Sequence, residues 1–192
     1  YSESKQYFIK LIKLNKDRYE GYLNFSNILV FEGKLKEANS LLKDYLLKIK
    51  SKSEIINGLA INLFNSKDYF ELNQHIDLYL KEHDNYLLNY LKGYYLDLTN
   101  TTNNSLFFLN KSLDLNSNFW PVYELLFYVY DRKSDLSSSE LLLEKANKIF
   151  INNYKLKYFE ALINFKLSKL DNVSIILNNK KLIKFFNKKE NT

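Results

Sequence analysis

The sequence contains no cysteine and no methionine, and it has only four glycines, one proline, one tryptophan and two histidines among 192 residues. Without cysteine the chain cannot form disulfides, bind zinc through thiolates or use a thiol as a nucleophile. So few glycines and prolines argue against an all-β fold, which needs a turn about every ten residues. The two histidines, His75 and His83, lack the spacing that places two ligands on one helix face, so they do not suggest a metal site.

Long apolar runs and phosphate-binding loops are also absent from the sequence. The longest apolar run, residues 125–130, is far shorter than the roughly 20 residues of a membrane-spanning helix. The four glycines are solitary, so no glycine-rich phosphate loop is present. We therefore expect no cofactor, no metal and no catalytic centre.

What the sequence does contain is a large apolar and aromatic fraction. Hydrophobic residues make up 46% and aromatic residues 16%, which excludes intrinsic disorder. The formal charge is +6, from 28 Lys+Arg against 22 Asp+Glu. The lysines are spread along the chain instead of forming a stripe, so the charge alone does not indicate a nucleic-acid partner.

The sequence repeats itself with a period of 34 residues. Residues 86–93 and 154–161 both read Tyr-x-Leu-x-Tyr-apolar-x-small, two periods apart, and residues 109–116 match residues 143–150 one period later. A small residue recurs in the same register, as Ser26, Ala60, Gly93 and Ala161. A period of this length in a helix-forming composition predicts an array of helical hairpins.

The copy in residues 22–46 resembles the tetratricopeptide repeat (TPR), and the copies starting near Ile56 and Tyr123 follow the same pattern. Two other copies are poorer, because Lys92, Lys157 and Glu160 stand where the family usually has apolar residues. The proline that commonly ends a repeat is missing. In the best copy the matching residues are Tyr22, Phe25, Ser26, Leu29, Gly33, Glu37, Ala38, Leu42 and Tyr45.

The resemblance implies an all-α fold, a right-handed superhelical solenoid with about 11 helices. We expect one domain over residues 1–192, with a half-repeat at 1–18 and repeats at 19–52, 53–85, 86–119, 120–153 and 154–187. The small residue of each unit would let the partner helix approach closely. Phe127 occupies that position in the fourth unit, so either that helix pair is splayed or its neighbours are trimmed to accept a ring.

In the family, the first helix of each hairpin lines the concave side of the array. Carried over to this sequence, the resemblance implies a groove that binds a partner segment. The expected groove residues are Asn27, Phe31, Ile61, Phe64, Tyr90, Leu91, Tyr94, Asp97, Leu125, Tyr128, Asp131, Arg132, Tyr158 and Phe159.

Two interpretations of these groove residues remain open. The rings either fill the space between helices, or they form an exposed aromatic stripe that receives a segment of another protein. In the second case Asp97 and Asp131 would favour a partner that carries Lys or Arg. A clamp for a partner's carboxyl terminus is not expected, because only Asn27 matches it and Leu23 and Leu87 stand where it needs polar groups.

The function that this pattern favours is a non-enzymatic scaffold that binds a protein or peptide partner. An RNA-binding helical repeat is an alternative, but it would need a basic stripe and a period of 35 residues. An envelope-associated assembly factor is another, because the sequence begins at Tyr1 instead of Met and is expected to be a piece of a longer precursor. The location would then be cytoplasmic or the cell envelope, and the oligomeric state stays open.

Two local features complete the sequence expectations. The basic end, residues 180–192, belongs to an amphipathic stretch that either caps the array or contacts a membrane or a partner. Trp120 is expected to cover the junction between the third and fourth units.

Overall fold

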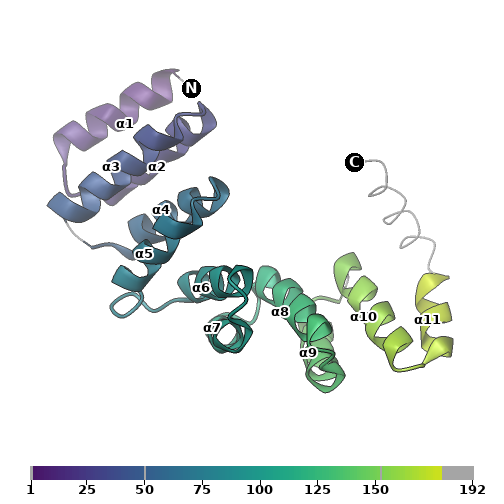
Figure 1. The fold of residues 1–192 in the computed structure, drawn as a ribbon. Helices are drawn as coiled ribbons and strands as arrows, with labels where there is room; N and C mark the ends of the chain where they lie inside the picture. Colours follow the sequence, from purple (N-terminus) through teal and green to yellow (C-terminus); the bar gives the residue numbers. More distant parts are fainter. Residues whose placement is uncertain (1, 50, 152, 179–192) are drawn as a thin grey trace. The chain divides into compact units, whose positions relative to one another are not determined.

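The structure is a computed structural model that describes residues 2–49, 51–151 and 153–178. Within this part the chain forms eleven α-helices and no strand, which confirms the all-α fold expected from the sequence. A leading helix, α1 (Ser2–Leu14), precedes five helical hairpins (Figure 1). The first helices of the hairpins are α2 (Tyr19–Phe31), α4 (Ser53–Asn65), α6 (Tyr86–Leu98), α8 (Trp120–Arg132) and α10 (Tyr154–Lys166). The second helices are α3 (Leu35–Lys48), α5 (Tyr69–Tyr79), α7 (Thr102–Leu115), α9 (Leu136–Ile149) and α11 (Leu170–Leu177).

Every first helix ends in the same backbone turn. A residue with positive φ follows the helix each time, and the N–H of the next residue donates to a carbonyl five positions back, as from Lys34 to Leu29 (2.8 Å). This geometry satisfies carbonyls that the end of a helix leaves without partners. The residues with positive φ are Gly33 (77°), Lys67 (61°), Asn100 (57°), Ser134 (54°) and Ser168 (59°).

Polar side chains at the starts of several helices accept hydrogen bonds from backbone N–H groups. Asp68 begins α5 in this way and Asp135 begins α9. Asn85 and Asn153 do the same for α6 and α10. Such caps favour helix formation at these positions.

The chain divides into two compact units, Tyr1–Leu115 (unit 1) and Asn116–Thr192 (unit 2). The expectation of a single domain over residues 1–192 concerns how the two units relate, and it stays a prediction. Each unit is therefore described by itself below.

The core of unit 1 runs through successive hairpins. Leu42, Ile55, Leu72 and Leu88, from α3, α4, α5 and α6, are fully buried and belong to one apolar cluster. The α1 helix contacts α2, α2 contacts α4, and α4 contacts α6. Because each helix pair buries its apolar side chains against the next pair, the hairpins form a continuous core.

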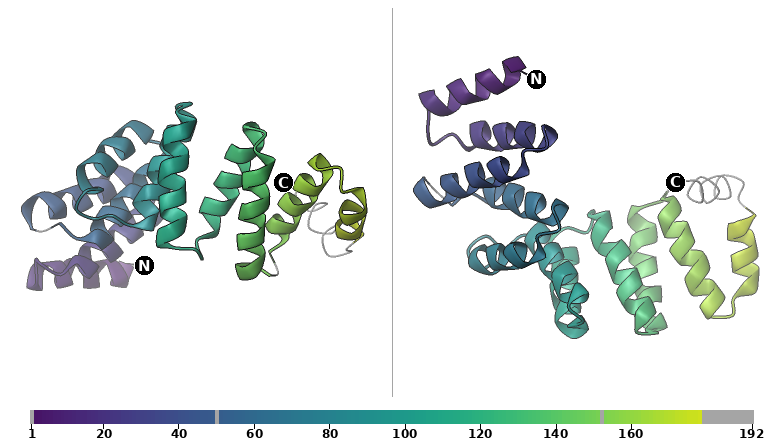
Figure 2. Two further views of the ribbon diagram at one scale, coloured as in Figure 1. Left: turned by 90° about the horizontal axis from the view of Figure 1, so that it is seen from below. Right: turned by 45° about the horizontal axis from the view of Figure 1, so that its top comes forward.

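Unit 2 has an aromatic core. In Figure 2 the hairpins α8/α9 and α10/α11 lie next to each other in both views. The buried rings of Phe127 in α8 and Phe159 in α10 stack with centroids 4.6 Å apart and an interplanar angle of 17°. Phe127, the large residue at the small position of the fourth repeat, is thus accommodated by a stacked ring from α10.

At the corresponding position of the third repeat, Gly93 permits a very close contact between α6 and α7. A Cβ added to Gly93 would lie 2.6 Å from Leu109 Cγ and Cδ2 in α7. The Ser105 hydroxyl donates to the Gly93 carbonyl (2.8 Å) across the same contact. Ser26 and Ala60 are fully buried at the equivalent positions, and Ser26 Oγ accepts from Asn62 Nδ2 of α4 (3.3 Å).

The basic end at residues 180–192 lies outside the described residues. The helix before it, α11, covers only the first part of the expected amphipathic stretch.

Candidate interaction surfaces

In unit 1, the first helices leave large apolar side chains in contact with solvent. Phe31 in α2, Ile61 in α4 and Leu98 in α6 keep 69%, 42% and 49% of their surface exposed. Phe31 and Ile61 are expected groove residues, and Leu98 follows Asp97, which is another. Asn27, one turn before Phe31, is also exposed. A partner segment that covered these residues would remove apolar surface from water.

Other predicted groove residues of unit 1 form a half-buried cluster of rings. Tyr94 packs edge-on against Phe64 (4.9 Å between centroids) and lies 6.0 Å from Tyr69 and 6.4 Å from Tyr90. Burial, and then a hydrogen bond with Tyr69, raise the pKa of Tyr94. These rings fill space between helices while keeping part of their surface open, so both interpretations of the groove apply to them.

Two predicted groove residues are buried instead of exposed. Leu91 is 2% exposed in the core cluster of unit 1, and Phe159 is 3% exposed against Phe127. These two residues therefore fill space between helices, which is the first of the two interpretations that the sequence left open.

In unit 2, two tyrosines rest on this buried aromatic pair. Tyr128 of α8 and Tyr158 of α10 are 45% and 43% exposed, and their rings meet Phe159 edge-on at 5.2 and 5.4 Å. Burial, followed by the nearby Glu124, raises the pKa of Tyr128, so the phenol stays neutral at physiological pH. Phe165, at the last turn of α10, is 62% exposed. Leu125 on α8 is half-buried and Arg132 is exposed.

Ion pairs between α8 and α10 accompany the tyrosine pair. Glu124 accepts from Lys155 Nζ at 2.8 Å, and Asp131 pairs with Lys166. The sequence analysis treated Asp131 as an acidic group that would attract a basic partner, together with Asp97. The structure pairs Asp131 with Lys166 within unit 2, and Asp97 lies in unit 1. The preference for a basic partner stays a prediction.

Trp120 packs inside unit 2. Its indole N–H donates to Glu124 (3.1 Å), and its ring meets Phe150 edge-on at 5.3 Å and lies parallel to Tyr123. The sequence analysis expected Trp120 to cover the junction between the third and fourth repeats. That role depends on how unit 1 and unit 2 relate, and it stays a prediction.

The histidines have ordinary hydrogen-bond partners. His75 is buried with Nε2 2.9 Å from the Ile56 carbonyl, and its burial lowers its pKa. His83 Nε2 lies 2.7 Å from the Ser51 hydroxyl. Within residues 2–49, 51–151 and 153–178, no group of three or more His, Cys, Asp or Glu side chains could hold a metal ion. No helix in that part of the chain is both long enough and apolar enough to span a bilayer.

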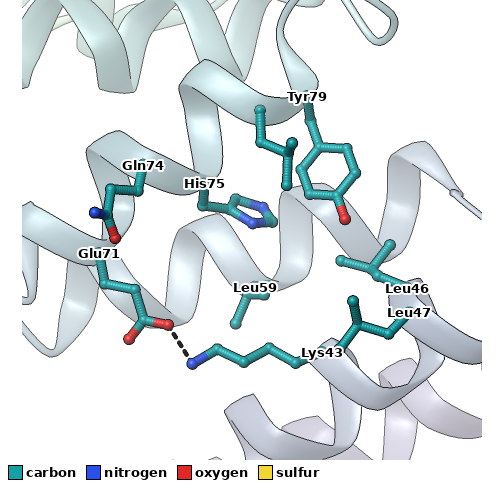
Figure 3. A pocket seen from close by; sticks show the side chains of 9 residues that line it. Lys43, Leu46, Leu47, Leu59, Glu71, Gln74, His75 and Tyr79 are labelled. Carbon is teal, nitrogen blue, oxygen red and sulfur yellow. Dashed lines mark ion pairs between the residues drawn. The ribbon is translucent and has the colours of Figure 1, made fainter.

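The sequence analysis missed a groove between α3 and α5, shown in Figure 3. Its rim contains Leu47 and Leu78, which are 80% and 67% exposed. The adjacent leucines at 46 and 47 gave no signal for it, because neighbouring apolar helix residues such as Ile55 and Ile56 can both be buried.

Comparisons with known proteins identify the fold. No protein-family model matches the chain, and no curated protein matches its sequence. Solved structures of TPR proteins match it over most of its length. YrrB, described as a TPR protein with an unusual peptide-binding site, has a TM-score of 0.68 and 19% identity, covering 94% of this chain and 97% of its own.

Two further structures give the same result. A TPR protein from Parabacteroides merdae matches with a TM-score of 0.71 and 16% identity, covering 88% of this chain and 66% of its own. PilF of Pseudomonas aeruginosa matches with a TM-score of 0.76 and 14% identity, covering 94% and 83%. The chain therefore has a TPR-like fold, as the 34-residue period predicted.

Proposed function

We propose that the chain is a non-catalytic scaffold that binds a segment of another protein along the faces built by its first helices. The observation that carries the proposal is the exposure of large apolar side chains on these helices. Phe31, Ile61 and Leu98 lie on unit 1, and Tyr128 and Tyr158 on unit 2. Aromatic and aliphatic anchors with polar neighbours are the composition of protein-binding surfaces. The peptide-binding site named for YrrB, a protein of similar fold, also supports a peptide partner.

The chemistry of these faces supports binding over catalysis. The carboxylates nearest the exposed tyrosines, Glu124 and Asp131, form ion pairs with lysines. Both carboxylates are thus already engaged by lysine side chains of α10. The buried Phe127–Phe159 stack supports the tyrosines from below, so a partner meets rings that are already positioned.

The test compares two double variants of the full chain. Tyr128→Ala with Tyr158→Ala removes rings from the proposed face of unit 2. Phe107→Ala with Leu141→Ala removes side chains of similar exposure, 64% and 62%, from second helices. Each immobilised variant is used to capture proteins from a lysate of the source cells, which are then identified by mass spectrometry.

We expect the tyrosine variant to lose proteins that the control variant and the unmodified chain retain. The loss of each tyrosine should cost about 1 to 2 kcal/mol of binding free energy, about tenfold in affinity. Melting followed by circular dichroism shows whether both variants stay folded. If the two variants capture the same proteins, the first-helix face of unit 2 is not the binding surface.

A further inference from the structure

The groove between α3 and α5 of unit 1 has the features of a second binding site, on helices that the proposed function does not use. Its part near the ends of α3 and α5 is a cavity of about 260 Å³. Leu59 of α4 forms the floor at 2% exposure, and His75 of α5 lies beside it at 8%. In Figure 3, Leu46 and Leu47 face this cavity from α3, while His75 and Tyr79 face it from α5.

The rim of the cavity is apolar and open to water. Leu47 and Leu78 stand on opposite helices and are 80% and 67% exposed. Full burial of a leucine side chain is worth about 1.5 to 3 kcal/mol, so a side chain that entered here and covered both would gain appreciable free energy. The cavity volume suits one large aliphatic or aromatic side chain.

The groove continues toward the beginnings of both helices as a polar pocket of about 420 Å³. Asn39 lines it, and its buried Oδ1 has no hydrogen-bond partner in the part of the chain that the structure describes. The lining residues of the two pockets run in the same order along α3 and α5. From Leu35 to Leu47 the groove follows α3 for about 18 Å, at 1.5 Å per residue.

The two walls of the groove carry opposite charges. The α3 wall contributes Lys36 and Lys43, whereas the α5 side contributes Asp68 and Glu71. Lys43 and Glu71 form an ion pair across the groove, drawn as a dashed line in Figure 3. Because Lys43 and Glu71 compensate each other, the remaining charges are Lys36 on the α3 side and Asp68 on the α5 side. A segment with only basic groups would be repelled by Lys36, and a segment with only acidic groups by Asp68.

We propose that this groove binds an amphipathic α-helix of a partner protein, with an apolar seam, an acidic edge over α3 and a basic edge over α5. The seam places one large side chain in the cavity between Leu47 and Leu78. Residues at i, i+3, i+4 and i+7 of a helix lie in a row about 10 Å long, which is shorter than the stretch of about 18 Å that the two pockets cover along α3. Both edges of such a helix can carry charges at the same spacing.

The nuclear magnetic resonance signal of the His75 ring can report on binding at the floor of this site. Its Nε2 lies 2.9 Å from the Ile56 carbonyl, so Nε2 donates that hydrogen bond. The charged groups that act on it are Glu71 on its own helix and Lys43 on α3. The chain has only two histidines, so a His83→Gln variant assigns the two ring signals in a nuclear magnetic resonance spectrum.

The experiment uses the full chain and two short synthetic peptides of high helix propensity with the same leucine seam. One peptide carries Glu along one edge and Lys along the other, and the second carries Lys along both edges. Fluorescence anisotropy of the labelled peptides gives the affinities, and the His75 ring signal shows whether the seam enters the cavity. We expect the mixed-charge peptide to bind at least about tenfold more tightly and to shift the His75 signal.

Variants locate the binding. Leu47→Lys with Leu78→Lys places charges on the rim and should weaken the mixed-charge peptide at least about tenfold. Leu141→Lys, at an α9 leucine with 62% exposure, is the matched control and should leave the affinity unchanged. Lys36→Glu alters one wall without touching the rim, and it should reverse part of the preference between the two peptides.

Equal affinities of the two peptides would overturn the proposal, as would rim variants that bind like the unmodified chain. If the Leu47→Lys, Leu78→Lys variant loses its helical signal, the Lys36→Glu variant becomes the test. If Lys36→Glu then leaves the preference for the mixed-charge peptide unchanged, the proposal is overturned. The readouts use helices other than those of the proposed first-helix surface, so this site can fail while that surface stands.

Discussion

The turns that end the first helices each place one residue in the left-handed backbone conformation. The five positions with positive φ hold one glycine, two serines, one lysine and one asparagine. Most side chains in this conformation cost about 1 to 2 kcal/mol, whereas glycine escapes the cost and asparagine adopts the conformation more readily. The fold therefore tolerates strain at Lys67, Ser134 and Ser168.

Replacing Ser134 by glycine should stabilise the protein. The variant relieves the strain at φ 54° and loses only part of the gain to the greater freedom of glycine in the unfolded chain. We expect the free energy of unfolding in urea, followed by circular dichroism, to rise by about 0.5 to 1 kcal/mol.

Ser137→Gly is the matched control, because Ser137 is exposed within the first turn of α9. The same chemical change there should lower stability by about 0.5 kcal/mol, through helix propensity alone. A loss of stability in both variants would show that Ser134 contributes contacts that outweigh its strain.

Among the helices, the α6/α7 hairpin differs from the other hairpins of unit 1 in how its helices meet. An alanine Cβ at Gly93 would come within 3.3 Å of the Leu109 backbone nitrogen as well as clashing with its side chain. At Gly58 the only severe contact would be with Leu23 Cδ1, the flexible end of a half-buried side chain. Both glycines lie within helices, so the comparison separates packing from helix propensity.

We expect Gly93→Ala to lower the free energy of unfolding by about 1 to 2 kcal/mol, because overpacking outweighs the gain in helix propensity. Gly58→Ala should change it by less than about 1 kcal/mol, because Leu23 can adopt another rotamer. Chemical denaturation of the two variants beside the unmodified chain measures both values. Equal effects at the two positions would mean that α6 and α7 can move apart without cost.

The positions of the helices could be predicted from the sequence, whereas the exposure of individual side chains could not. The period set the starts of the first helices, and Tyr19, Tyr86 and Trp120 begin α2, α6 and α8. Which face of a helix turns inward depends on its neighbours. Leu91 is buried while Leu98, on the same helix, is half-exposed, and a repeat pattern alone does not distinguish them.

The charges of the candidate site were equally hard to infer. Asp131 and Lys166 are 35 residues apart, and Glu124 and Lys155 are 31 apart, so their pairing depends on how α8 and α10 pack. The groove between α3 and α5 also needs the packed structure, because its walls belong to two hairpins. Sequence reasoning placed each of these residues on a helix but could not place the helices against one another.

For the molecule as a whole, the described core suggests that unit 1 can fold by itself. Its buried cluster extends from Tyr22 to Leu91 and draws on α2 to α6. A length of 115 residues is typical of an independent domain. The single tryptophan, Trp120, lies in unit 2, so its fluorescence reports on unit 2.

A fragment of residues 1–115 should be helical and unfold in one cooperative transition in urea. Circular dichroism of the fragment gives this transition, and the tryptophan fluorescence of the full chain gives that of unit 2 for comparison. A fragment without a cooperative transition would show that the cluster from Tyr22 to Leu91 is not sufficient for folding.

The turn that ends each first helix also bears on how such a gene can change in length. Because the left-handed residue recurs at 33 or 34 positions, from Gly33 to Ser168, loss or duplication of one whole unit returns every turn to its place. An insertion or deletion of another size inside a helix would rotate the residues that follow it, so that apolar side chains leave the buried face. Descendants of this sequence should therefore differ in length by whole hairpins more readily than by a few residues within one.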